Sequence, residues 1–312
     1  MIPSTKNTFG FAQEAMQFWD FKNPKLTHLG DSGNSVYLVQ TENQKFILRL
    51  TSTAYRTKPE NQAELEFLLH LNKNGVKVNF PILSKNTNLV EEITSSNDLT
   101  CSVFNFVEGE FVKPSSELWN KEMFLNWGKT LGQIHKFAMT FEPKSNCDRW
   151  HWNEEVLIRD AKILIPKSDS KSFEELEFLI ERIGLLPKIK ENYGLVHADF
   201  APQNFAYGKN GLFAFDFGNC CYHWFVSDLA ISLSVLRRQK EKEKYQEWIF
   251  EGYEKVKPLP NSELQNLDLF FRLRLLYVYL SRLYKFGMNP TKEEKKILVE
   301  LKSRVHQKLS LM

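Results

Sequence analysis

Three polar side chains in the middle of the chain carry the clearest chemical signal. Asp199, Asn204 and Asp216 lie within one short stretch of the 312-residue sequence. Each aspartate follows a run of apolar, strand-forming residues, so we expect each carboxylate where a buried strand gives way to a loop. The turn at residues 208–211 contains two glycines and predicts a hairpin. Such a hairpin would bring the three side chains to one end.

These side chains are suited to phosphate chemistry. Carboxylate and amide oxygens are ligands that Mg²⁺ prefers, usually a few from the protein together with substrate phosphates, so Asn204 and Asp216 are candidate metal ligands. Asp199 is then left to meet an incoming hydroxyl. Loop capping is the commonest use of Asp and Asn and would explain any one of them alone. The ordered set favours the catalytic interpretation.

A glycine-rich turn lies upstream and is a candidate phosphate-binding segment. It reads Gly30-Asp-Ser-Gly-Asn-Ser35, and its candidate residues are Gly30, Ser32, Gly33 and Asn34. Small residues let backbone N–H groups approach a phosphate closely. An ordinary hairpin turn explains the same residues about equally well.

Arg49 is unusual because it lies inside the apolar strand 46–50. A cation on a strand that faces a cleft would pair with phosphate, although an outward-pointing arginine fits the pattern equally well. Glu64, on the helix that follows, could hold Arg49 by an ion pair. Considered alone, Glu64 is typical of a solvated helix residue.

The elements that must position these residues fall into two regimes. From about residue 26 to 107 the pattern is strand-like, with a hairpin at 35–50, a helix at 61–74 and a strand pair at 89–107. From Ser115 onward helices dominate, and capping-box signatures at Ser172, Ser262 and Thr291 predict three helix starts. We therefore expect an α+β fold with an N-terminal domain, 1–107, and a helical C-terminal domain, 108–312.

Composition excludes several classes of protein. The net charge of +3 gives no general case for nucleic-acid binding, and no apolar run approaches the length of a membrane span. The N-terminus does not resemble a signal peptide. The four cysteines lack metal-ligand spacing, so we expect reduced thiols in a cytoplasmic protein.

The order of these motifs resembles the protein-kinase-like fold. More specifically, His197-Ala-Asp-Phe-Ala-Pro-Gln-Asn204 and Asp216-Phe-Gly, followed by Asp228-Leu-Ala, resemble the aminoglycoside phosphotransferase/choline kinase-like family. The resemblance implies two lobes: a small antiparallel sheet with one helix, and a larger, mainly helical lobe. Three departures stand out: Ala198 replaces a common Gly, Gln203 lies where Gly is frequent, and Arg49 replaces the more frequent Lys.

The resemblance implies a role for each candidate residue. Asp199 would accept the proton of the acceptor hydroxyl, and His197 would orient the catalytic loop. Asn204 and Asp216 would bind Mg²⁺, and Asp228 would brace the loop. The nucleotide would be bound by Gly30, Ser32, Gly33, Asn34, Arg49, Glu64 and the connector residues Phe106 and Glu108.

The implied activity is transfer of the ATP γ-phosphate to a hydroxyl of a small molecule. Aminoglycosides or amino-sugars, choline and homoserine-like compounds are all open as acceptors, and the sequence does not decide between ATP and GTP. The side chains of Trp150, Trp152, Glu154 and Glu155 would suit a cationic amine, or they are core aromatics beside a solvated helix start. We expect no nucleic-acid or membrane partner, and a monomer or homodimer.

Two alternatives belong to other classes. A protein Ser/Thr kinase of the same fold would need a peptide-binding segment after Asp-Phe-Gly, but only eleven residues separate Asp216 from Asp228. A non-catalytic nucleotide-binding module usually loses the base or a metal ligand. This chain keeps Asp199, Asn204 and Asp216, which favours an enzyme.

Overall fold

The computed structural model describes residues 8–31, 33–143 and 148–309. Its chain divides into two compact units. Unit 1 comprises Met1–Lys113, Thr140–Arg149 and Phe205–Gly218; unit 2 comprises Pro114–Met139, Trp150–Asn204 and Asn219–Met312. Unit 1 thus includes two segments from later in the chain, and a division at residues 107 and 108 stays a prediction.

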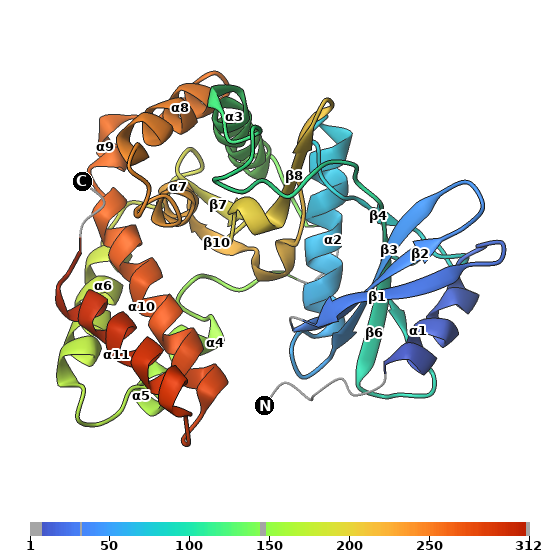
Figure 1. The fold of residues 1–312 in the computed structure, drawn as a ribbon, viewed down its shortest axis with the longest axis horizontal. Coiled ribbons are helices and arrows are strands. Elements are labelled where there is room, and N and C mark those ends of the chain that lie inside the picture. Colours follow the sequence, from blue (N-terminus) through green and yellow to red (C-terminus); the bar gives the residue numbers. More distant parts are fainter. Residues whose placement is uncertain (1–7, 32, 144–147, 310–312) are drawn as a thin grey trace. The chain divides into compact units, whose positions relative to one another are not determined.

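Unit 1 is built on an antiparallel sheet (Figure 1). In its described residues the strand order is β1-β2-β3-β6-β4, with β5 paired to β6. The strands are β1 (Lys25–Asp31), β2 (Asn34–Gln40), β3 (Lys45–Ser52), β4 (Pro81–Ile82), β5 (Glu91–Glu92) and β6 (Leu99–Asn105). The predicted hairpin and the second strand pair are confirmed as β2–β3 and β5–β6.

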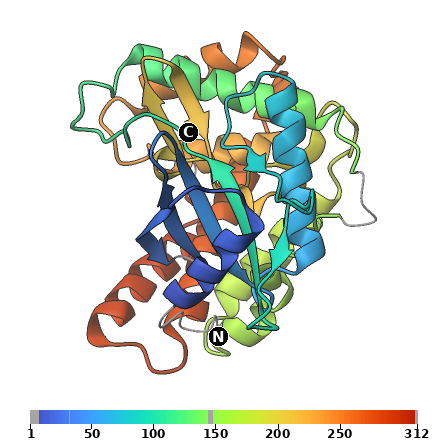
Figure 2. The same ribbon diagram turned by 90° about the vertical axis from the view of Figure 1, so that its right-hand side faces the viewer.

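The two faces of this sheet pack against different helices. Leu48 and Leu50 of β3 belong to a buried core cluster with Ala12 and Ala15 of α1 (Phe9–Ala15), the dark blue helix that lies against the sheet in Figure 2. Because strand side chains alternate, Arg49 points to the opposite face, where it meets α2 (Lys58–Lys73). The helix begins three residues before its predicted start of 61.

A second hairpin in unit 1 leads to Asp216. Strands β8 (Phe205–Gly208) and β9 (Gly211–Ala214) pair in antiparallel register, as predicted. Isolated bridges connect Tyr207 to Glu110 and Ala214 to Val78. These contacts fix the strand that ends two residues before Asp216.

Unit 2 is mainly helical. Its helices are α3 (Lys121–Ala138), α4 (Val156–Arg159), α5 (Ala161–Leu164), α6 (Ser170–Gly184), α7 (Phe225–Ser234), α8 (Lys242–Glu254), α9 (Asn261–Leu264), α10 (Leu267–Phe286) and α11 (Lys292–His306). Strands β7 (Tyr193–Val196) and β10 (Cys221–Trp224) pair in antiparallel register. With the sheet of unit 1, this confirms the predicted α+β fold class.

One of the three predicted helix starts is confirmed. Thr291 and Glu294 form the capping box of α11. The prediction at Ser172 is wrong, because Asp169 lies three residues earlier and accepts a hydrogen bond from the Ser172 N–H. The prediction at Ser262 is also wrong: the short helix α9 ends at Leu264, and α10 begins separately.

Helices α3 and α8 pack closely because glycine lines their crossing. A Cβ added at Gly128 would lie 1.9 Å from the Ile249 carbonyl oxygen, and one added at Gly252 would lie 2.1 Å from that of Leu125. Only residues without a Cβ permit this approach. The crossing brings His135 of α3 to Tyr253 of α8. Within the described residues, no helix combines the length and apolarity needed to span a membrane.

Candidate active site

The His197-Ala-Asp turn of unit 2 follows β7 and is held by Asp228 of α7. The backbone N–H of His197 donates to Asp228 Oδ2 at 2.7 Å, and that of Ala198 donates to Oδ1 at 2.8 Å. Ala198 adopts a left-handed conformation with φ of 64°. An L-residue is strained in this conformation. Glycine, which is common at this position in the family that the sequence resembles, is not. Asp228 therefore fixes a strained turn.

Asp228 is fully buried in a network of donors. His135 Nε2 lies 3.3 Å from Oδ2, and His135 Nδ1 lies 2.9 Å from the hydroxyl of Tyr253. Burial acts to raise the pKa of Asp228, but the hydrogen bonds and the charge around it lower that pKa overall. Burial also lowers the pKa of His135, so a neutral imidazole donates to the carboxylate and accepts from Tyr253.

Asp199 is oriented from three directions. Its backbone N–H donates to His197 Nδ1 at 3.3 Å, which gives His197 the expected contact with the catalytic loop. Asn204 Nδ2 donates to the Asp199 backbone oxygen at 2.8 Å and to Oδ2 at 3.0 Å. Arg274 donates to Oδ1 at 2.6 Å. The structure thus joins Asp199 and Asn204, while Asp216 belongs to unit 1 and its place beside them stays a prediction.

In unit 1, Arg49 is held by Glu64 in a bidentate pair. The guanidinium donates to Oε1 at 2.7 Å and to Oε2 at 3.0 Å, and both side chains are buried. Burial alone would raise the pKa of Glu64, but the charge and hydrogen bonds of Arg49 lower it. The interpretations of Arg49 as outward-pointing and of Glu64 as solvated are therefore wrong.

The Asp-Phe-Gly turn is anchored by two arginines that the sequence did not single out. Arg149 donates to the Gly218 carbonyl at 2.6 Å and to the Glu60 carbonyl of α2 at 3.0 Å. Arg56 donates to the same Gly218 oxygen at 3.3 Å. Arg149 thereby connects α2, which carries Glu64, to the turn that carries Asp216. No local pattern around either arginine signals this contact.

The glycine turn between β1 and β2 has specific supports. Gly33 has a φ of 85°, and a Cβ there would lie 3.0 Å from the Tyr55 ring, so the turn requires glycine. Asn34 Oδ1 accepts a hydrogen bond from Thr51 Oγ1 at 2.8 Å. Gly30 lies in β1 beside a register shift. Ser32 lies outside the described residues.

The connector after β6 is accessible. Phe106 is 38% exposed, with Lys45 Nζ 5.5 Å from its ring centroid, and Glu108 is exposed. Asn105 Oδ1 accepts from the Phe80 N–H at 2.6 Å and ties the connector to the chain before β4. The adenine-binding roles of Phe106 and Glu108 stay predictions.

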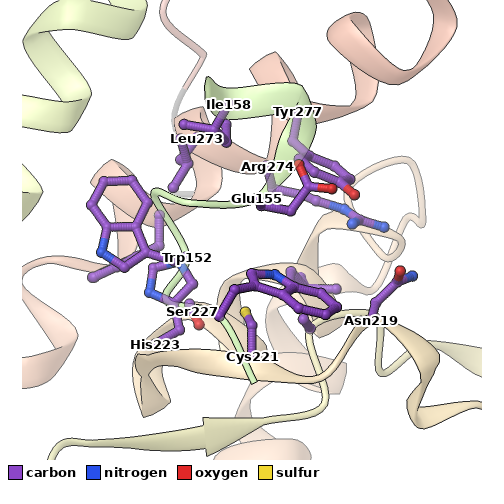
Figure 3. A pocket seen from close by; sticks show the side chains of 14 residues that line it. Trp152, Glu155, Ile158, Asn219, Cys221, His223, Ser227, Leu273, Arg274 and Tyr277 are labelled. Atoms are coloured by element: carbon purple, nitrogen blue, oxygen red, sulfur yellow. The ribbon is translucent and has the colours of Figure 1, made fainter. Parts of the chain in front are cut away.

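Unit 2 contains a cavity with an empty volume of about 590 Å³ (Figure 3). Trp150, Trp152 and Glu155 line it, together with residues of α7 and α10. Glu154 is not a lining residue: its carboxylate accepts from the His151 N–H at 2.8 Å. Trp152 lines the cavity and is also a buried core residue, so both interpretations apply to it. The inclusion of Glu154 is wrong.

Polar groups are unevenly distributed around this cavity. Figure 3 shows Glu155, Arg274 and Tyr277 on one side, with Trp152 and His223 on another. Burial lowers the pKa of His223 to about 3, so this imidazole is neutral, and its Nδ1 accepts from the Trp224 N–H at 3.0 Å. The cavity therefore has a charged side, formed partly by Arg274, the partner of Asp199, and a neutral aromatic side.

Fold and site together define a small-molecule phosphotransferase of the kinase-like type. The model of the phosphotransferase enzyme family matches residues 26–260. This chain belongs to that family. Its activity is accordingly the ATP-dependent transfer of phosphate to a hydroxyl of a small molecule.

Individual relatives are kinases of small molecules. The chain is 30% identical to the amicoumacin kinase of Bacillus subtilis, over 91% of this chain and 87% of the relative. It is 26% identical to the homoserine kinase of Bartonella henselae, over 82% and 79%.

Solved structures show the same fold. An amicoumacin kinase in complex with AMP-PNP, Ca²⁺ and Ami matches with a TM-score of 0.91 and 24% identity, over 98% of this chain and 95% of that one. A microcompartment-associated aminopropanol kinase matches with a TM-score of 0.79 and 20% identity, over 96% and 95%.

Proposed function

We propose that this chain transfers the γ-phosphate of ATP to a hydroxyl of an amine-bearing small molecule, with Mg²⁺ as the metal and Asp199 as the base. The observation that carries this proposal is the orientation of the Asp199 carboxylate by Asn204 and by Arg274, a lining residue of the unit 2 cavity. A cytoplasmic monomer or homodimer would suit this activity.

Unit 1 supplies the groups for the nucleotide. Arg49, kept in place by Glu64, offers a fixed cation to the α- and β-phosphates. Gly30, Gly33 and Asn34 would cover the phosphates, and the connector at Phe106 and Glu108 would meet the base. GTP would be bound by the same groups.

Asn204 and Asp216 are the proposed metal ligands. Asn204 Nδ2 is engaged by Asp199, which leaves its Oδ1 as the atom suited to a hard cation. The Asp216 carboxylate is a ligand of the same chemical type. A bound Mg²⁺ would neutralise charge on the nucleotide phosphates during transfer.

The proposed reaction is one displacement at phosphorus. The acceptor hydroxyl donates a hydrogen bond to Asp199 and its oxygen attacks the γ-phosphorus. The bond from that phosphorus to the oxygen it shares with the β-phosphate breaks, and ADP leaves with that electron pair. Asp199 accepts the hydroxyl proton. The loose transition state needs positioning more than covalent help.

The acceptor is expected to carry an amine near its hydroxyl and an apolar body. Glu155 lines the charged side of the cavity, and Arg274 on that side contacts Asp199, so two carboxylates lie near one guanidinium, which favours a cation. The 30% identity to an amicoumacin kinase supports an acceptor like amicoumacin over homoserine.

Two measurements test the proposal. ADP release is recorded with a panel of amicoumacin, homoserine, aminopropanol, choline and an aminoglycoside, and Asp199→Asn should abolish it while ADP binding persists. Turnover by Asp199→Asn within threefold of the unmodified protein, or no acceptor giving ADP release, would contradict it.

Neighbouring glutamates provide a matched control for the acceptor. Glu155→Gln should raise the KM for an amine-bearing acceptor about tenfold, since about 1.4 kcal/mol of attraction is lost. Glu154→Gln should leave that KM unchanged, because Glu154 does not line the cavity. Equal changes in KM for the two substitutions would show that Glu155 is not part of the acceptor site.

A further inference from the structure

We propose that Arg274 is a positioning residue for the catalytic base: it fixes the direction of the Asp199 carboxylate. This inference rests on the proposed role of Asp199. Arg274 lies on α10, lines the unit 2 cavity and contacts Asp199 at 2.6 Å. The two side chains are 16% and 23% exposed, so solvent screens their attraction only in part.

The first part of the argument is geometric. Asn204 donates to Asp199 Oδ2, and Arg274 donates to Oδ1. With one donor on each oxygen, the carboxylate cannot rotate about its terminal bond without losing a hydrogen bond. Each carboxylate oxygen retains a further lone pair for the acceptor hydroxyl. Arg274 therefore sets the direction in which that lone pair points.

The second part concerns the donor itself. A guanidinium is a planar fork with fixed N–H directions, whereas an ammonium on a flexible stem is a point charge. A lysine at this position would therefore keep the charge beside Asp199 without fixing the direction of its carboxylate.

The same helix provides a matched control. Arg272, two residues earlier on α10, forms a bidentate pair with Glu175 of α6 at 2.7 and 2.8 Å. Residues two apart on a helix do not share a face, and Arg272 is not among the lining residues of the cavity. Arg272 and Arg274 are therefore both ion-paired arginines of one helix, but only Arg274 contacts the base.

The experiment compares Arg274→Gln, Arg274→Lys and Arg272→Gln in the full chain. The readouts are kcat, the KM values for ATP and for the acceptor that releases most ADP, and the Tm. We expect Arg274→Gln to lower kcat about 100-fold, because the base is no longer aligned. Its KM for ATP should change less than about threefold, since the nucleotide groups are in unit 1.

The conservative variant separates positioning from structure. Arg274→Lys keeps the charge without the planar fork, so it should recover only part of the kcat that Arg274→Gln loses. Arg272→Gln should lower the Tm but leave kcat unchanged.

Two results would overturn the inference. One is a kcat within threefold of the unmodified protein in an Arg274→Gln protein that folds; the other is an Arg272→Gln protein that loses as much kcat as Arg274→Gln. If Arg274→Gln does not fold, full kcat in Arg274→Lys would equally contradict it. Failure of the proposed function is distinguished by Asp199→Asn: full turnover there removes the base itself, whereas an inactive Asp199→Asn with an unchanged kcat in Arg274→Gln removes only the role of Arg274.

Discussion

The two units hold their charged groups by opposite means. In unit 1 the fixed groups are cations: Arg49 is held by a carboxylate, and Arg149 is held by two backbone carbonyls. In unit 2 the fixed groups are carboxylates: Asp228 is held by backbone N–H groups, and Asp199 by an amide and a guanidinium. Each arrangement suits a different half of phosphoryl transfer.

The difference shows how the chain separates polyanion binding from proton acceptance. Pre-positioned cations lower the cost of gathering a nucleotide's negative charge, whereas a carboxylate ringed by donors stays ionised and in place. The two units also differ in how they respond to substitution. Both members of a side-chain ion pair can be replaced together, but backbone N–H groups remain when the carboxylate that accepts from them is removed.

The largest effect is expected for Asp228→Ala in unit 2. This substitution leaves the N–H groups of His197 and Ala198 and the imidazole of His135 without their common acceptor in a fully buried position. We expect the free energy of unfolding in urea to fall by about 4 kcal/mol, with loss of activity.

A double variant tests whether backbone donors carry this effect. His135→Phe alone keeps both backbone hydrogen bonds to Asp228 and should destabilise less. Added to Asp228→Ala, it should recover little stability, because the N–H groups of His197 and Ala198 stay buried without an acceptor. If the double variant instead recovers most of the lost stability, the cost of Asp228→Ala comes mainly from the His135 side chain.

Glu64→Ala should have the next largest effect on stability, and further substitution of its partner Arg49 should reverse most of that effect. The substitution leaves Arg49 charged and buried without its partner. Breaking such a pair costs about 3 kcal/mol, but replacing both members with apolar residues is often close to neutral. We therefore expect Arg49→Met with Glu64→Leu to regain most of the stability in urea while ATP binding stays weak. If the double variant is no more stable than Glu64→Ala, the expected difference between the side-chain pair of unit 1 and the backbone donors to Asp228 is wrong.

Arg149→Ala should have a smaller effect, concentrated on the nucleotide. It removes the connection between the Glu60 and Gly218 carbonyls and so loosens Asp216 relative to α2. We expect about a tenfold weaker affinity for ADP in the presence of Mg²⁺, measured by calorimetry. The control is Arg159→Ala, an exposed arginine paired with its neighbour Asp160. Identical affinities in the two variants would show that the Gly218 contact does not support the nucleotide site.

Sequence reasoning located the parts of the site that depend on local spacing. Asp199 and Asn204 are five residues apart, so one turn brings them together. The alternation of β3 predicts that Arg49 and its neighbours point to opposite faces, although not that both faces are buried. Arg274 and Arg149 lie 75 and 69 residues from their partners, and arginine is common on helix surfaces. Nothing local distinguishes such residues, because chain folding alone creates their contacts.

Helix starts show a different limit. Thr291 directly precedes its helix, and the prediction held. Before α6, Asp169 competes with Ser172, and the structure uses the carboxylate. The sequence alone does not decide which of two neighbouring residues caps a helix, because several residue types satisfy the same N–H groups at similar free energy. Packing then decides between them.

The smallest effect at neutral pH concerns a neutral imidazole in unit 2, that of His223. Its folded pKa of about 3 lies below the ordinary value for histidine, so the unfolded chain binds a proton between these values and the folded protein does not. The resulting stability is fully present above about pH 6.5 and is lost as the pH falls toward 3, by about 1.4 kcal/mol per pH unit. His223→Gln should therefore flatten the decline in the free energy of unfolding between pH 7 and 5, measured in urea.

Two histidines control this measurement. His151 is exposed, so His151→Gln should leave the slope of the unfolding free energy against pH unchanged. His135 is also buried with a lowered pKa, so part of the slope should persist in His223→Gln. A slope identical to that of the unmodified protein would mean that His223 takes up its proton in the folded state. The aromatic side of the cavity would then carry a positive charge at low pH and disfavour the amine-bearing acceptor.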